Sequence, residues 1–321
     1  MLRVLGELES EEIMNKAYIP KKSATLNVII DFYLASEAFK RLRPATQKDY
    51  ESNLASVRTT VVEGKALGLY RNQYLKVRHL TDAYEQWLQK GVRTANYHRS
   101  VLSTAWMHSM RYDVMTHNPV KLIKTQSSET RQVMWTREHV KAFLDVAYSG
   151  FEYRSIGLIV HMAYDWGQRV GDMRLLTWDK LDLDQCQLEL KQSKRNAHVK
   201  LPISADLCKM LNAQKEDFGY QEYVAPRVKH RAGDYPPYDI NEISYLVNTL
   251  LDKANLPREL TAMDLRRTAV TEMLEGGVDI AGIRQVTGHK NMHSIVPYMV
   301  NTYSGATKAL SARGGKDDEH S

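Results

Sequence analysis

Five side chains in the second half of the sequence could together hold a phosphodiester and attack it. They are Arg169, Lys194, Arg266, His289 and Tyr298, and the tyrosine follows the histidine by nine residues. Arginine carries a permanent charge on a planar fork that binds phosphate oxygens bidentately. Tyrosine is a weak nucleophile at its ordinary pKa of about 10, so it needs a base or nearby positive charge to react. This set predicts nucleophilic attack on a phosphodiester by a phenolic oxygen.

Short motifs surround these residues and carry a family resemblance. The motifs are Gly167–Asp172, Gln192–Lys194, Asp264–Thr268 and Thr287–Lys290, followed by Tyr298. Their order and spacing resemble those of the tyrosine recombinases, the phage-type integrases of DNA. The resemblance is strong at these motifs and looser over the amino-terminal helical region.

The resemblance implies a role for each residue. Arg169 and Arg266 would clamp the scissile phosphate, and Tyr298 would attack it to form a 3′-phosphotyrosyl bond. His289 would donate a hydrogen bond to the phosphate or position the tyrosine. Lys194 would protonate the departing 5′ hydroxyl as general acid. The phosphotyrosyl bond stores the energy of the broken linkage, so we expect neither a cofactor nor a metal ion.

Asp264 departs from the family pattern. Ahead of the second arginine the family usually carries a histidine, whereas this chain has Asp264 two residues before Arg266. A bare carboxylate about 4 Å from a phosphate would be repelled by roughly 4 kcal/mol at an effective dielectric of about 20. It must therefore pair with an arginine, be set back from the phosphate, or be protonated. We expect a supporting residue that orients Arg266 or Arg169. Asp172, one helical turn after Arg169, is expected to orient that arginine too.

Simpler interpretations exist for each residue taken alone. Either arginine could form a structural ion pair, Lys194 could be a solvated turn residue, and His289 could cap a helix. Tyr303 competes with Tyr298, but its spacing from the histidine fits poorly. Two other functions also stay open: a type IB-like topoisomerase, and a catalytically silent DNA-binding relative. The domain order and the Gly288-His289 pair argue against the first, and the intact residue set argues against the second.

The bulk composition fits a nucleic-acid partner without requiring one. The 321 residues carry a net charge of +6, and many unrelated proteins are this basic. Cys186 and Cys208 lack a paired metal-ligand spacing, so we expect them to be structural residues in a reducing compartment. No apolar run reaches the length of a membrane-spanning helix, and no signal-peptide core opens the chain. We expect a cytoplasmic, nucleoid-associated protein.

The predicted fold is mainly α with a small antiparallel sheet, in a two-domain tyrosine recombinase architecture. Helical periodicity runs through most of the chain, while alternating apolar residues between 178 and 201 indicate short antiparallel strands. The segment 121–134 lacks periodicity and is rich in polar residues, as in a linker. The expected parts are an amino-terminal extension (1–23), a helical, SAM-like core-binding domain (24–120), a linker (121–134), an integrase-type catalytic domain (135–303) and a carboxy-terminal tail (304–321).

The expected partner is a double-stranded DNA recombination site gripped by both domains. The resemblance implies a homotetramer on two such sites, with possible DNA-bending or directionality accessory proteins and no membrane. The reaction would integrate or excise a phage or other mobile element. Basic residues expected to contact the DNA are Arg93, Arg99, Lys121, Lys124, Arg227, Lys229 and Arg231.

Overall fold

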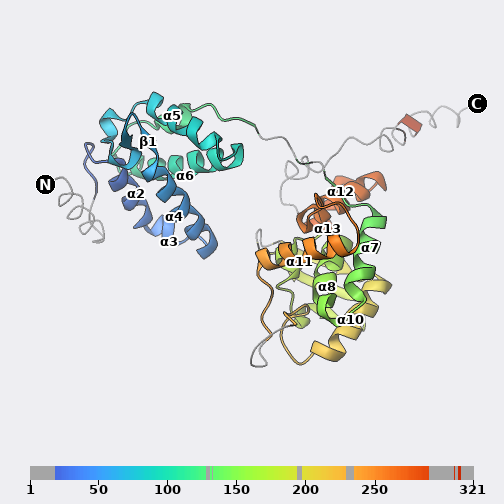
Figure 1. Cartoon of the computed structure of the whole chain (residues 1–321). Helices are drawn as coiled ribbons and strands as arrows, with labels where there is room; N and C mark the ends of the chain where they lie inside the picture. Colours follow the sequence, from blue (N-terminus) through green and yellow to red (C-terminus); the bar gives the residue numbers. More distant parts are fainter. Residues whose placement is uncertain are drawn as a thin grey trace, which may run out of the picture. The chain divides into compact units, whose positions relative to one another are not determined.

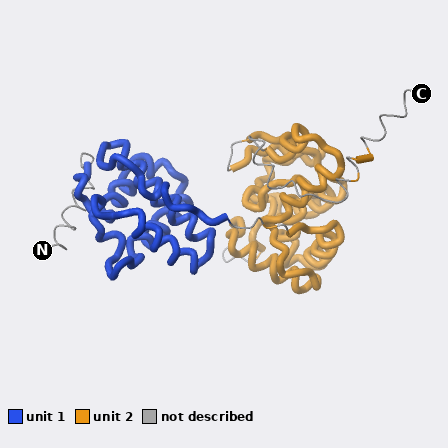
Figure 2. Tube along the Cα trace, turned by 90° about the horizontal axis from the view of Figure 1, so that it is seen from above, with its two compact units in different colours: residues 1–129 blue, residues 130–321 orange. Residues whose placement is uncertain are grey.

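The computed structural model divides the chain into two compact units. It describes residues 19–127, 131, 133–193, 197–228, 235–288, 307, 310 and 311. Unit 1 spans residues 1–129 and unit 2 spans residues 130–321 (Figure 2). Each unit has a hydrophobic core of its own. The division falls inside the polar segment 121–134.

Unit 1 is a bundle of helices built around a long central one. Helix α6 (Val92–Met110) packs against α2 (Leu26–Leu34), α4 (Pro44–Thr59) and α5 (Val77–Leu88) (Figure 1). Proline opens α4 in its first turn, where its missing N–H costs no hydrogen bond. The remaining elements are α3 (Glu37–Lys40), the two-stranded hairpin of β1 (Val61–Val62) and β2 (Lys65–Ala66), and the 3-10 turns η1 (Leu67–Leu69), η2 (Asn72–Tyr74) and η3 (Pro119–Leu122).

Unit 2 is built around a second buried helix. Helix α8 (Arg154–Asp165) is apolar and buried on most of its surface, and it packs against the other long helices of the unit. These are α7 (Arg137–Tyr148), α10 (Ala205–Phe218), α11 (Ile240–Lys253) and α12 (Leu265–Glu275). Unit 2 also contains the short helices α9 (Val170–Met173) and α13 (Ile280–Thr287). The 3-10 turns are η4 (Phe151–Tyr153), η5 (Trp178–Lys180) and η6 (Ala262–Asp264).

One small antiparallel sheet completes unit 2. Its strand order is β3 (Leu181–Asp182), β4 (Gln187–Lys191), β5 (His198–Pro202). Leu188 and Leu190 of β4 and Val199 and Leu201 of β5 point into the core, whereas their neighbours are more exposed. The alternation along the sequence therefore predicted this sheet correctly, and the mainly α fold class is confirmed.

The hydropathy of the helices in the described residues was compared with that of membrane-spanning segments. No helix among them combines the length and the apolar character needed to cross a membrane.

Candidate active site

Arg169 lies where the chain turns from α8 into α9. Gly167 has a left-handed backbone (φ 56°), which permits the sharp turn, and Arg169 occupies the position before the first residue of α9. The guanidinium Nη1 lies 3.7 Å from Oδ2 of Asp172, which is 4% exposed. Asp172 also accepts a hydrogen bond from the backbone N of Ser193 at 3.0 Å. As predicted, Asp172 contacts Arg169, and it also holds the β4–β5 turn next to Lys194.

Arg266 is fixed by the ends of two other helices. It lies in the first turn of α12 and is only 5% exposed. Its Nη1 donates to the carbonyl of Gly167 at 3.0 Å, and its Nη2 donates to the carbonyl of Thr287 at 2.7 Å. Helix α12 lies beside α13 in unit 2 (Figure 1). The guanidinium thus links the segment that carries Arg169 to the carboxyl end of α13.

Gln192 connects Arg169 to the Thr287 carbonyl that Arg266 also binds. The fully buried amide accepts a hydrogen bond from Arg169 Nη1 at 3.1 Å and donates one to the Thr287 carbonyl at 2.8 Å. The two arginines, far apart in sequence, are therefore joined through one side chain and one carbonyl.

Gly288 ends α13 in a conformation that other residues rarely adopt. Its φ of 66° is left-handed, and its N–H donates to the carbonyl of Arg284 at 2.8 Å. A Cβ built at this position would lie 2.8 Å from Nε2 of Gln192. Both the backbone and the close approach of Gln192 require glycine immediately before His289.

Three of the predicted catalytic residues, Lys194, His289 and Tyr298, lie outside the described residues. The chain neighbours of Lys194 and His289 are described, however. Ser193 and Gly288 both contact the group formed by Arg169, Asp172 and Gln192. The structure therefore brings the two arginines together with the residues next to the predicted lysine and histidine.

Asp264 was expected to orient Arg266 or Arg169, but in the structure it binds a different arginine. The carboxylate is 5% exposed and accepts hydrogen bonds from Arg131 Nε at 3.1 Å and Nη2 at 3.0 Å. It also accepts from the backbone N and hydroxyl of Thr261, at 3.1 and 2.7 Å. The hydrogen bond to Asp264 raises the pKa of Arg131 above its ordinary value. The cation that pairs with Asp264 is therefore Arg131. In the 3-10 turn η6, which Asp264 ends, the side chain exposed to solvent is Met263, at 81%.

The predicted DNA-contacting residues fall into three groups. Arg93, Lys121 and Lys124 are exposed on unit 1. Arg99 instead donates to the carbonyls of Val120 and Lys121, at 3.1 Å each, and Arg227 pairs with Glu242. Lys229 and Arg231 lie outside the described residues. The contacts of all these basic residues with DNA stay predictions. Arg99 and Arg227 have a structural role as well, because each has a partner within its own unit.

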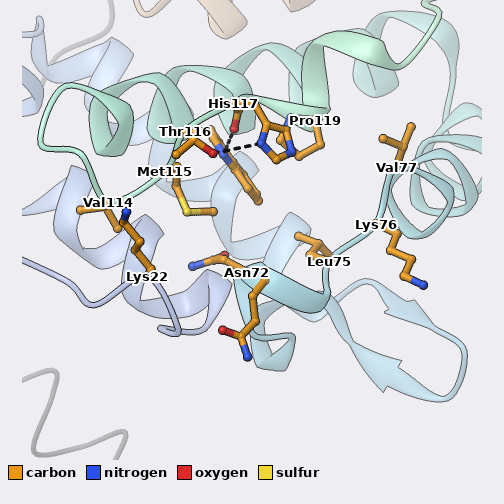
Figure 3. A pocket seen from close by; sticks show the side chains of 12 residues that line it. Lys22, Asn72, Leu75, Lys76, Val77, Val114, Met115, Thr116, His117 and Pro119 are labelled. Carbon is orange, nitrogen blue, oxygen red and sulfur yellow. Dashed lines mark hydrogen bonds between the residues drawn. The ribbon is translucent and has the colours of Figure 1, made fainter.

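Unit 1 contains a pocket of about 450 Å³ (Figure 3), whereas the two arginines belong to unit 2. Lys22, Lys76 and His117 line it together with the apolar Trp106 and Met115. The indole N–H of Trp106 donates to the His117 carbonyl at 3.0 Å, which fixes one wall.

Sequence reasoning missed the roles of Arg131 and Gln192. Arg131 lies in the polar segment predicted as a linker, and no local pattern marks a partner as distant in sequence as Asp264. Gln192 stood in the motif Gln192–Lys194, but only the packed structure shows that its amide reaches both α9 and α13. Among the described residues, no cluster of three or more His, Cys, Asp or Glu side chains is arranged to hold a metal ion.

Comparison with known proteins identifies the family. The phage integrase family model matches residues 133–304. Tyrosine recombinase XerC of Listeria innocua is 23% identical over 284 residues, covering 83% of this chain and 89% of the relative. Tyrosine recombinase XerA of Thermococcus kodakarensis is 30% identical over 175 residues, covering 54% of this chain and 60% of the relative.

Solved structures share the fold. A lambda integrase dimer bound to a COC′ core site has a TM-score of 0.70 at 19% identity, covering 87% of this chain and 78% of that one. The Tn1549 transposon integrase in complex with circular intermediate DNA has a TM-score of 0.69 at 16% identity, covering 90% and 99%. With more than half of its length matched by the family model, the chain belongs to the phage integrase family and is a tyrosine recombinase.

Proposed function

We propose that this protein is a site-specific DNA recombinase that cuts and rejoins duplex DNA through a 3′-phosphotyrosyl bond on Tyr298. The observation that carries the proposal is the joining of Arg169 and Arg266 through Gln192 and the Thr287 carbonyl. Two fixed guanidinium groups are suited to the charge that develops on a phosphodiester under attack. The neighbours of Lys194 and His289 lie at the same place.

The proposed cleavage step uses each of these groups once. The Tyr298 oxygen attacks the phosphorus and gives up its proton to solvent water, while the bond from phosphorus to the 5′ oxygen breaks. Lys194 gives a proton to that departing oxygen. Arg169, Arg266 and His289 stabilise the negative charge on the non-bridging oxygens. Attack by a 5′ hydroxyl on the phosphotyrosine reverses the step and reseals a strand.

The proposed substrate is the attachment site of a phage or other mobile element in the host nucleoid, and the reaction is its integration or excision. A solved lambda integrase tetramer bound to a Holliday junction has a TM-score of 0.69 to this chain, which supports assembly of four copies on two sites. Exposed Arg93, Lys121 and Lys124 supply sequence-independent phosphate contacts. DNA-bending or directionality proteins would act alongside the tetramer.

The experiment is covalent capture of DNA in the host cell. Tagged protein is purified under denaturing conditions, and the DNA that remains attached is sequenced. We expect one or a few discrete sites for the wild type and none for Tyr298→Phe. Adducts scattered over the genome would instead support a topoisomerase, and no adduct with the wild type would support a silent DNA-binding relative.

A further inference from the structure

The buried amide of Gln192 ties together the segments that carry the predicted catalytic groups. We propose that Gln192 is a positioning residue for strand cleavage: it does not touch the DNA, but it sets the relative placement of Arg169 and Arg266. The proposal rests on the proposed function, since its effect is measured on the covalent step.

Both polar atoms of the amide are used to join the arginines. Oε1 accepts from Arg169 Nη1 at 3.1 Å, and Nε2 donates to the Thr287 carbonyl at 2.8 Å. The same carbonyl accepts from Arg266 Nη2 at 2.7 Å. An amide offers an acceptor and a donor on one planar group. A carboxylate would place an oxygen against the Thr287 carbonyl, and an apolar side chain would lose both links.

A second buried glutamine holds this amide in place. Gln192 Nε2 also donates to Gln168 Oε1 at 2.5 Å, and Gln168 Nε2 donates to the carbonyls of Trp166 and Val286, at 2.8 and 2.7 Å. Both glutamines are fully buried. Because buried polar groups are costly to leave unpaired, such a network has one favoured arrangement. The ends of α8 and α13 are therefore locked to the β4–β5 hairpin.

The backbone of Gln192 extends this link to the remaining predicted residues. Its N–H donates to the Ala197 carbonyl at 2.9 Å, and Lys194 lies in the sequence between these two residues. Its side chain packs where a Cβ on Gly288 would otherwise lie, immediately before His289. Gln192 thus contacts Arg169, adjoins the residues next to Lys194 and His289, and shares the Thr287 carbonyl with Arg266.

Replacing Gln192 should slow the chemical step more than it weakens DNA binding. Misplacing a catalytic group by about 1 Å can cost about 10²-fold in rate. We therefore expect Gln192→Met, which keeps the length but removes both hydrogen-bonding atoms, to cleave roughly 10- to 100-fold more slowly. The apparent Kd for duplex DNA should change by less than about threefold, because most affinity comes from phosphate contacts elsewhere.

Gln214 provides a matched control. It is also a fully buried glutamine of unit 2 whose Oε1 accepts from an arginine, Arg154, at 2.7 Å. Its Nε2 donates to a carbonyl, that of Val224, at 3.1 Å and to the Ser155 hydroxyl at 3.2 Å. Gln214→Met removes an equivalent network and should lower the unfolding midpoint comparably. The folded fraction of this variant should still cleave at the wild-type rate.

The test measures single-turnover cleavage of a nicked duplex that carries the captured site, with unfolding midpoint and DNA affinity measured in parallel. A double-mutant cycle with Arg169→Lys asks whether Gln192 acts through that arginine. If it does, Gln192→Met should cost less than about threefold in the Arg169→Lys background. Gln192→Asn, which keeps an amide but shortens its reach, should also slow cleavage. It replaces Gln192→Met in the assay if the methionine variant does not fold.

Three results would overturn the proposal. They are wild-type cleavage by Gln192→Met, an equal loss of cleavage in Gln214→Met at matched stability, and an undiminished effect of Gln192→Met in the Arg169→Lys background. Failure of the proposed function looks different, because the wild type itself would then form no adduct with the DNA.

Discussion

Replacing Asp264 by alanine should destabilise unit 2 by about 2–3 kcal/mol. The carboxylate is 5% exposed and accepts hydrogen bonds from Arg131 and from Thr261. Breaking a fully buried ion pair costs about 3–5 kcal/mol, and an exposed pair is worth about 0–1 kcal/mol. The Arg131 side chain is 45% exposed, so it can return to water once the carboxylate is gone. The expected cost therefore lies between these limits.

Removal of the other partner should cost less. In Arg131→Ala the carboxylate keeps the N–H and hydroxyl of Thr261, and water can enter the half-exposed position of the guanidinium. We expect about 1–2 kcal/mol for this variant and a coupling of about 1 kcal/mol in the double mutant. Asp264→His should be about as unstable as the alanine variant, since a neutral imidazole has a single acceptor nitrogen.

Denaturant unfolding of the full chain measures these changes, and hydrogen exchange in α12 assigns the transition to unit 2. Cleavage by Asp264→Ala should slow by about tenfold, because the turn before Arg266 loosens, whereas Arg266→Ala should lose about 10²-fold or more. Wild-type stability in Asp264→Ala, or no coupling between the two positions, would refute the account. So would a histidine variant that is as stable as the wild type.

Three other predictions follow from single contacts. Gly288→Ala should lose cleavage and at least about 1 kcal/mol of stability, since its φ of 66° is left-handed and its Cβ would lie 2.8 Å from Gln192 Nε2; unchanged single-turnover cleavage would contradict this. Burial, and then the charges of Lys90 and Arg111, lower the pKa of His98 and His108. The unfolded state therefore binds more protons below the ordinary histidine pKa of about 6.5, and unit 1 should lose stability as the pH falls from about 7.5 to about 5.5. His98→Gln/His108→Gln should flatten that dependence, and a slope equal to the wild type would contradict the assignment. Cys186 Sγ lies 3.1 Å from Cys208 Sγ, so a thiol oxidant such as diamide should join them in a disulfide, seen by mass spectrometry as the loss of two hydrogens. Two thiols still free after prolonged oxidation of the folded protein would exclude it.

Local features of both units were predictable where one residue decides the local structure. The helical region expected over residues 24–120 includes α6 (Val92–Met110), which starts directly after Gly91, whose φ is 111°. Thr136 caps α7 by accepting a hydrogen bond from His139 N at 3.2 Å. The β1–β2 hairpin was missed because strands of two residues are too short to show alternation.

The site was predictable only in its parts. Residue types and spacing indicated Arg169, Arg266 and the glycine before His289. The partner of Asp264 was not indicated, because the Arg131 contact depends on packing between segments distant in sequence. The link through Gln192 depends in the same way on where α8 and α13 end. Local patterns specify elements, whereas hydrogen bonds between elements follow from the packed fold.

In the proposed reaction Tyr298 forms the covalent bond to DNA, and peptide mapping of the trapped complex tests this directly. A nicked suicide duplex carrying the captured site is incubated with the protein, the adduct is digested, and mass spectrometry locates the nucleotide. We expect a 3′-phosphate linked to Tyr298, which is lost in Tyr298→Phe while DNA binding is retained. A nucleotide attached to Tyr303, or to any residue other than Tyr298, would contradict it.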